Sequence, residues 1–144
     1  MITTSTALQF FLNLSKIQSV VTRRFDGRLN GVGWTDFIIL LQLSQAPDEK
    51  LRRIDLAEKI GLTASGVTRV LLPMEKIGLV SREINENDAR VSYVVLAPGG
   101  KEKLFEALER AEYLSQSAIP ASKMSRLGEI SETLNEIGGA VMWN

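Results

Sequence analysis

The spacing of the apolar residues changes at Gly78, and this change restricts the fold more than any other feature of the sequence. Between Ile54 and Ile77, apolar residues recur every three or four positions, which is the period of an amphipathic helix. Beyond Gly78, residues 79–84 and 91–96 form two short runs separated by a polar turn. Runs of this kind are typical of a β-hairpin. The chain therefore places helices directly before a hairpin.

Helical spacing also covers most of the remaining chain. We expect helices over residues 4–26, 36–45, 54–60, 98–117 and 122–137, and another that begins after Thr63 and runs to Gly78. The prediction is a mainly α fold of the α+β winged-helix kind, with four helices, a β-hairpin wing and then two C-terminal helices.

Several residues mark where these helices begin and end. Thr4 or Ser5, Thr35 and Thr63 are suitable N-caps, while Gly27 and Gly61 stand at expected helix ends. Pro73 lies inside the helix that follows Thr63. Because proline removes a backbone donor and clashes with the preceding turn, we expect a kink or a new helical start there.

The composition excludes most catalytic chemistry. The 144 residues include no cysteine and no histidine, so a thiol nucleophile, a disulfide and a histidine general base are all impossible. The sequence contains no P-loop, no dinucleotide fingerprint and no GxSxG motif. We therefore expect a protein that is not an enzyme and that uses no cofactor or metal. The lack of a long apolar run or a signal peptide predicts a cytoplasmic protein without a membrane partner.

Residues 54–71 have the features that a DNA-reading helix-turn-helix requires. A short helix ends at Gly61, and a second helix begins after the N-cap Thr63. If the apolar face of the second helix is buried, Ser65, Thr68 and Arg69 face outward. Hydroxyl groups can contact bases or phosphates, and arginine can bridge guanine in the major groove. The predicted buried face consists of Val67, Val70, Leu71 and Met74, and Leu56, Ile60 and Leu62 are expected to pack against it.

The hairpin turn carries a second indication of nucleic-acid binding. Arg90 stands at the end of this turn, where a guanidinium can enter a narrow minor groove. Asp88, two residues earlier, can orient that guanidinium through a charge-assisted hydrogen bond. The alternative is an ordinary surface ion pair that contributes little.

These motifs resemble those of the MarR family of winged helix-turn-helix transcriptional regulators. The similar segments are Asp55-Leu56-Ala57, Gly61 to Arg69, Met74 to Val80, and Asp88-Ala89-Arg90 with Val94, Leu96 and Gly100 after it. The resemblance implies a single MarR-type domain over residues 1–144. Within it, residues 34–98 would form the DNA-binding region, and residues 1–33 and 99–144 would be dimerisation helices. The apolar residues near both ends, including Phe10, Phe11 and Val141-Met142-Trp143, also favour a homodimer.

The resemblance assigns candidate residues to the DNA contact. Arg52 stands where the family often has a capping Thr or Ser; it caps poorly but can contact phosphate. Gly66 permits close approach of the backbone. The candidate DNA-binding residues are Arg52, Thr63, Ser65, Gly66, Thr68, Arg69, Asp88 and Arg90, and the expected partner is double-stranded DNA with a near-palindromic operator.

The resemblance also implies regulation by a ligand. Many members are released from DNA by small aromatic or phenolic effectors, so a repressor of this kind is expected here. Phe11, Trp34 and Phe37 are candidates to line an effector pocket, or they are ordinary core residues. The formal net charge is zero, with 17 basic and 17 acidic residues. This balance leaves open a winged-helix protein-interaction module that does not bind DNA.

Overall fold

The computed structural model describes residues 1–143, with side chains described as far as residue 140. The chain forms two compact units, Met1–Ala111 and a second that begins at Glu112, and each is described by itself. The side chains of Val141, Met142 and Trp143, which entered the homodimer prediction, lie outside the described part.

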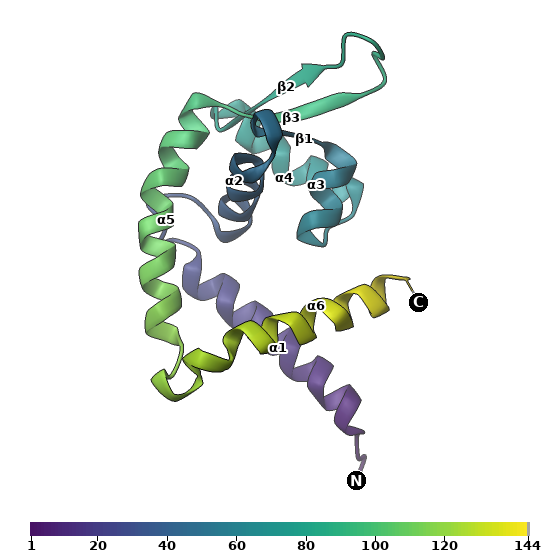
Figure 1. Ribbon diagram of the computed structural model, residues 1–144, viewed down its shortest axis with the longest axis vertical. Helices are drawn as coiled ribbons and strands as arrows, with labels where there is room; N and C mark the ends of the chain where they lie inside the picture. The colour runs from purple at the N-terminus through teal and green to yellow at the C-terminus, as the bar shows by residue number, and fades with distance from the viewer. Residues whose placement is uncertain (144) are drawn as a thin grey trace. The chain divides into compact units, whose positions relative to one another are not determined.

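The order of elements matches a mainly helical winged-helix fold (Figure 1). The α-helices are α1 (Thr6–Phe25), α2 (Trp34–Gln45), α3 (Arg53–Ile60), α4 (Ala64–Lys76), α5 (Pro98–Ala118) and α6 (Leu127–Trp143). The strands are β1 (Lys50–Arg52), β2 (Val80–Ile84) and β3 (Ser92–Leu96), and the short 3₁₀ helices are η1 (Pro47–Glu49) and η2 (Ala121–Arg126). The predicted fold class is therefore confirmed.

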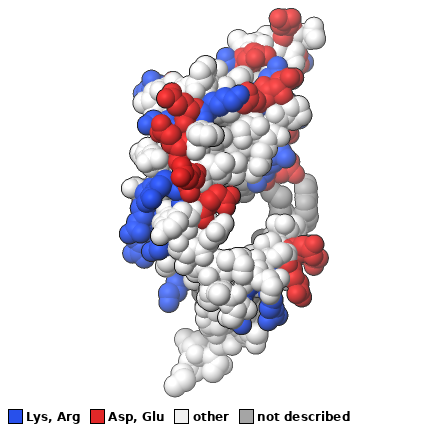
Figure 2. Space-filling model, turned by 60° about the vertical axis from the view of Figure 1, so that its left-hand side comes forward, with Lys and Arg blue, Asp and Glu red and all other residues white. Residues whose placement is uncertain are grey.

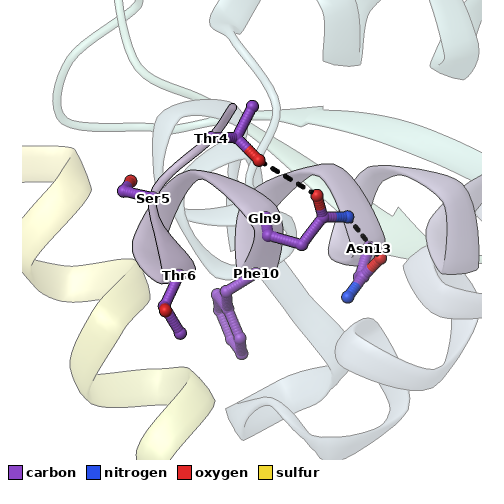
Figure 3. Close-up of a pocket in the computed structure, with 6 residues that line it drawn as sticks. All are labelled: Thr4, Ser5, Thr6, Gln9, Phe10 and Asn13. Carbon is purple, nitrogen blue, oxygen red and sulfur yellow. Dashed lines mark hydrogen bonds between the residues drawn. The ribbon is translucent and has the colours of Figure 1, made fainter. Parts of the chain in front are cut away.

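Helix α1 is a long helix, and few of its side chains are buried against the rest of its unit. The Ser5 hydroxyl caps it by accepting a hydrogen bond from the backbone N–H of Leu8 at 3.1 Å. Thr4, Gln9 and Asn13 form a chain of side-chain hydrogen bonds along one side of its first turns (Figure 3). Of the twenty residues in α1, only Phe25 is buried. Most of the apolar surface of this helix is therefore free.

Helix α2 supplies the centre of the core. Phe37, Ile39, Leu40 and Leu43 are all buried, as expected for a helix that is apolar on every side. The predicted N-cap Thr35 is wrong, because the helix begins at Trp34 and its N-cap is Gly33. Gly33 makes no side-chain capping bond.

A three-stranded antiparallel sheet joins the hairpin to the helices. The strand order is β1-β3-β2, and β2 pairs with β3 from Val80 opposite Leu96 to Ile84 opposite Ser92. Strand β1 was not predicted; its three residues pair with Tyr93–Val95. Lys50 on β1 forms a 2.8 Å ion pair with Glu83 on β2 and lies over the Tyr93 ring. The base of the hairpin is thus held by three strands.

Helices α3 and α4 form the helix-turn-helix. Gly61 adopts a left-handed conformation at φ +73° and ends α3, as predicted. Helix α4 continues through Pro73 to Lys76, so the alternative of a new helical start is wrong. Pro73 stands in the last turn of α4, so the hydrogen bond that it cannot donate to the Arg69 carbonyl is one of the last in the helix. Leu62 is 38% exposed, so it is not the core residue that was predicted.

The first turn of α5 packs against the backbone that follows α4. The Ala97 N–H donates to the carbonyl of Leu79 at 3.1 Å. A Cβ atom at Gly100 would lie 2.0 Å from that same carbonyl oxygen, so only glycine fits there. Leu104 and Ala107 then continue a buried face along α5. The Gly78–Leu79 turn and α5 are therefore in backbone contact.

The second unit begins within α5. The helix predicted over residues 122–137 is instead a 3₁₀ helix followed by α6, which starts at Leu127. Met124, Ile130 and Leu134 are exposed within this unit. In the part of the chain that the structure describes, no helix is both long and apolar enough to cross a membrane.

Candidate nucleic-acid interface

Helix α4 presents a polar face because its apolar residues turn inward. Val67, Leu71 and Met74 are buried, while Ser65 and Arg69 are exposed and Thr68 is half-buried. Val70 is half-buried rather than fully buried. The structure thus brings Ser65, Thr68 and Arg69 together on one face, as the periodicity predicts.

Two of the candidate residues at the start of α4 also shape the helix itself. The Thr63 hydroxyl accepts a 3.0 Å hydrogen bond from the backbone N–H of Gly66, which is the capping bond of the helix. A Cβ atom at Gly66 would lie 3.1 Å from this hydroxyl oxygen. The Thr68 hydroxyl donates to the Ala64 carbonyl at 3.0 Å. Its lone pairs remain available to accept a further hydrogen bond.

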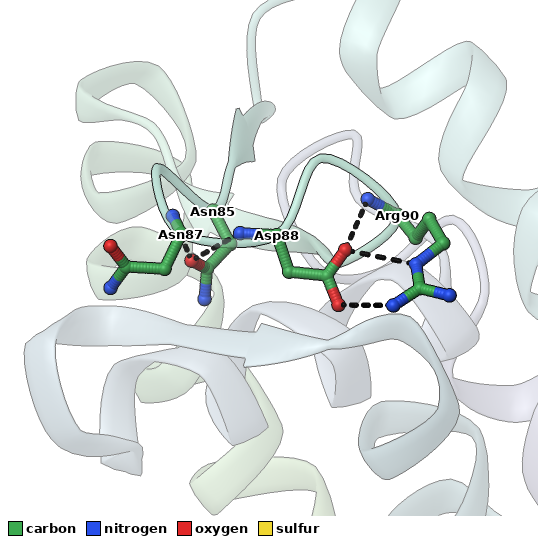
Figure 4. A network of polar contacts seen from close by, with 4 residues as sticks. All are labelled: Asn85, Asn87, Asp88 and Arg90. Carbon is green, nitrogen blue, oxygen red and sulfur yellow. Dashed lines mark hydrogen bonds and ion pairs between the residues drawn. The ribbon is translucent and has the colours of Figure 1, made fainter.

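The Arg90 side chain is held at the tip of the hairpin by Asp88 (Figure 4). Asp88 Oδ1 accepts from the backbone N–H of Arg90 at 3.0 Å and from Nε at 3.1 Å, and Oδ2 accepts from Nη2 at 3.3 Å. These bonds to Arg90 hold the pKa of the Asp88 carboxyl below its ordinary value. The Arg90 side chain is 91% exposed. An exposed guanidinium at the tip of a hairpin can enter a narrow minor groove.

Asn85, which is not among the predicted site residues, shapes this tip. Its side-chain oxygen accepts from the backbone N–H groups of Asn87 at 2.8 Å and Asp88 at 3.3 Å. Asparagine at the start of a polar turn commonly forms such a turn with its own side chain, and this preference was the available signal.

Arg52 is placed where the sheet meets α3. It is the N-cap residue of α3 but makes no side-chain capping bond. Its guanidinium instead donates to both carboxylate oxygens of Asp55, at 3.0 and 3.4 Å. This hydrogen bond, and then the charge of Asp55, raise the pKa of Arg52. Arg52 therefore keeps its positive charge at the surface next to α3.

The three candidate effector residues do not come together. Trp34 stacks with Phe25 and Phe37, with ring centroids 4.3 and 5.7 Å away. Phe11 pairs instead with Phe10 at 5.6 Å. It lies fourteen positions before Phe25 on α1, or about 21 Å along a helix that rises 1.5 Å per residue. Only Trp34 and Phe37 share a cluster.

Charges of both signs lie side by side on the surface. On the one face that Figure 2 shows, lysine and arginine lie near aspartate and glutamate, and no continuous basic surface covers that face. Arg52 with Asp55, Arg82 with Glu75, and Arg90 with Asp88 are such pairs. Any attraction for DNA must therefore come from local arrangement and not from the net charge.

A helix-turn-helix with an exposed polar second helix, followed by a hairpin with an arginine at its tip, defines a winged helix-turn-helix domain. Residues 32–92 match the model of the MarR family. This match covers the winged helix-turn-helix and less than half of the chain, so the chain is similar to the MarR family over that region.

A curated relative agrees with this similarity. Over 106 residues the chain is 31% identical to the HTH-type transcriptional repressor YetL of Bacillus subtilis (strain 168). That match spans 71% of this chain but 62% of the relative, which is less than two thirds of its length.

Solved structures share the whole fold. The transcriptional regulator BldR from Sulfolobus Solfataricus superposes with a TM-score of 0.82 at 28% identity, covering 97% of this chain and 99% of that one. Sco3205, a MarR family transcriptional regulator from Streptomyces coelicolor solved in complex with DNA, gives 0.75 at 24% identity, covering 94% and 91%.

Proposed function

We propose that this protein is a DNA-binding transcriptional regulator that acts in the cytoplasm on double-stranded DNA. The observation that carries the proposal is the polar face of α4, with Ser65, Thr68 and Arg69, in the same unit as the exposed Arg90 of the hairpin. Helix α4 would enter the major groove, and the hairpin would reach the neighbouring minor groove. Sco3205, which shares the fold, was solved in complex with DNA, and this supports DNA binding.

The proposed active form is a homodimer. Leu8, Leu12 and Ile17 on α1 are each about half exposed, at 49%, 50% and 54%. A monomer rarely leaves so much apolar surface on one helix, and such surface marks an interface. Residues 1–33 and 99–144 would then form the dimerisation region, and a two-fold dimer would bind a near-palindromic operator.

The proposed activity is repression that a small aromatic effector relieves. The name of the YetL relative supports the repressor role. An aromatic effector could stack on the cluster of Phe25, Trp34 and Phe37. Trp34 is the half-buried member of this cluster, so its ring is partly accessible to a ligand. A change in tryptophan fluorescence on adding substituted phenols or benzoates, absent in Trp34→Leu, would support this assignment. Phe11 is not part of this cluster.

Selection from a random pool of DNA duplexes, followed by gel-shift titration, tests the proposal. Wild-type protein should enrich a near-palindrome, and Arg69→Ala should weaken binding to it by about 1–3 kcal/mol if Arg69 contacts a base bidentately. If Arg69 contacts phosphate instead, all sequences should be weakened equally. Arg110→Ala on α5, which removes an equal charge, should bind as wild type. Failure of the wild-type protein to bind any duplex would favour the protein-interaction alternative.

A further inference from the structure

Three arginines line one pocket between the helix-turn-helix and the hairpin. Arg52 ends β1 and is the N-cap of α3, Arg53 is the first residue of α3, and Arg90 comes from the hairpin. Ala64, the first residue of α4, and Ser92, the first residue of β3, also line it, together with Ile54 and Val91. The pocket therefore borders both elements that the proposed function assigns to DNA.

The positive charge of this pocket is only partly neutralised. Arg52 and Arg90 are each paired with one aspartate. Among the described residues, Arg53 forms no ion pair, and its Nε atom is buried without a hydrogen-bond acceptor. The cluster thus has one more cation than it has carboxylate partners. An incompletely bonded guanidinium of this kind is an energetic cost that an anion would offset.

The backbone of α3 adds to the attraction for an anion. Its N-cap residue provides no side-chain acceptor for the first N–H groups of the helix. Unsatisfied N–H groups and the helix dipole both favour negative charge at this end. The arginine side chains and the helix end therefore favour the same ligand, which is a single anionic group.

DNA geometry identifies that anion. If α4 lies in the major groove and the hairpin reaches the adjacent minor groove, one sugar–phosphate strand must pass between them. The pocket occupies this position, between Ala64 and Ser92. We propose that it holds one backbone phosphate of the operator and that Arg53, together with Arg52, is the positioning contact. This inference rests on the proposed function and adds to it Arg53, a residue outside the predicted DNA-binding set.

A phosphate contact has a measurable signature in salt. Each neutralised phosphate steepens the dependence of log affinity on log salt concentration by about 0.9. Arg53→Gln should make this slope shallower by about one per protomer, and it should weaken the selected operator and a scrambled duplex by the same factor. Arg53→Lys, which keeps the charge, should retain most of the slope. Arg110→Gln is the matched control for loss of a surface cation, and its slope should not change.

Arg52→Ser separates a DNA contact from a structural role. Serine at this N-cap would add the missing acceptor, so the melting temperature should rise. The salt slope should fall nonetheless, because one cation of the pocket is gone. If Arg52 and Arg53 served only to stabilise the fold, a variant with a higher melting temperature would not show a shallower dependence of log affinity on log salt concentration.

A second measurement uses only the wild-type protein and does not depend on how the variants fold. Operator duplexes would each carry one uncharged methylphosphonate in place of a phosphate. We expect one sensitive position per half-site, between the bases protected in the major groove and those protected in the minor groove. Binding by wild type with no such position, or an unchanged slope in Arg53→Gln, would overturn the inference alone. Absence of wild-type binding to any duplex would overturn the proposed function as well.

Discussion

The carboxylate of Asp26 accepts a 2.6 Å hydrogen bond from the backbone N–H of Trp34, the first residue of α2. Asp26 is also the C-cap residue of α1, so one side chain connects the end of α1 to the beginning of α2. It supplies the negative charge and the acceptor that Gly33 lacks. A second carboxylate, that of Asp36, lies in the first turn of the same helix.

Asp36 should make folding depend on pH in the direction opposite to most aspartates. Burial, and then the charge of Asp26, raise the pKa of Asp36 in the folded protein. The ionised form therefore opposes folding at neutral pH, and this penalty disappears as the pH falls through the folded pKa toward the ordinary value of 3.8. Asp36→Asn should raise the free energy of unfolding in urea at neutral pH and have less effect near pH 4.

Asp88→Asn is the matched comparison for Asp36→Asn, because the pKa values of the two aspartates are shifted in opposite directions. The pKa of Asp88 is lowered, so its ionised form supports folding above its ordinary pKa, and this support is lost as the pH falls through the folded value. Its substitution should slightly destabilise the protein at neutral pH. A loss of stability in Asp36→Asn at neutral pH would contradict the assigned direction.

Gly100→Ala should strongly destabilise the protein. The added Cβ would lie 2.0 Å from the Leu79 carbonyl oxygen, so the backbone of α5 or of the Gly78–Leu79 turn would have to move. We expect a loss of about 1–3 kcal/mol or more, measured by urea unfolding. Gly128→Ala is the control, because a Cβ there meets nothing within 4 Å, and it should not destabilise. Equal stability of the two variants would disprove the close contact.

Charge on the apolar face of α1 should produce a monomer. Leu12 and Ile17 are exposed in the single chain, and the proposed dimer would bury them. A buried, unpaired carboxylate is costly, so Leu12→Glu with Ile17→Glu should shift the mass in light scattering from twice 15.9 kDa to 15.9 kDa. Lys59→Glu, at an exposed position of α3 outside the proposed dimerisation region, should remain dimeric. A wild-type protein that is already monomeric at micromolar concentration would refute the dimer.

Arg90 should confer a preference for A·T-rich sequence beside each half-site. A narrow A·T minor groove has an enhanced negative potential, which favours an inserted guanidinium. Wild type should bind operators with A·T flanks more tightly than those with G·C flanks, and Arg90→Ala should lose this difference. Fluorescence anisotropy with the four combinations measures the effect. If both proteins discriminate equally, the Asp88–Arg90 pair serves only the shape of the turn.

Periodicity predicted the parts of the fold that depend on local sequence. The buried face of α4, the caps Ser5 and Thr63 and the stop at Gly61 each follow from residues within one helix. Strand β1 escaped prediction because three residues cannot show a period of two, and its pairing partner lies more than forty residues away. The N-cap of α2 was missed for a similar reason, since the capping carboxylate of Asp26 lies eight residues before Trp34, the first residue of the helix.

The candidate site likewise contains residues that local sequence predicts and residues that only the fold brings together. Ser65, Arg69 and Arg90 are exposed, as their positions in a helix face and a turn predict. Arg53 stood out only in three dimensions, because its place beside Arg90 depends on the fold of the hairpin against α3. Phe11 was grouped with Trp34 on residue type alone, and the length of α1 separates them.

Strand β1 ends its pairing at Tyr93, whereas β2 accompanies β3 one residue further, to Ser92. The hairpin is therefore three-stranded where it joins the helices. Beyond Tyr93 it consists of one further strand pair and the loop that carries Arg90. Two paired strands alone are only marginally stable, whereas the three strands near the helices form a more stable sheet. We therefore expect Arg90 to adjust to the local shape of a groove while the strand register near α3 stays the same.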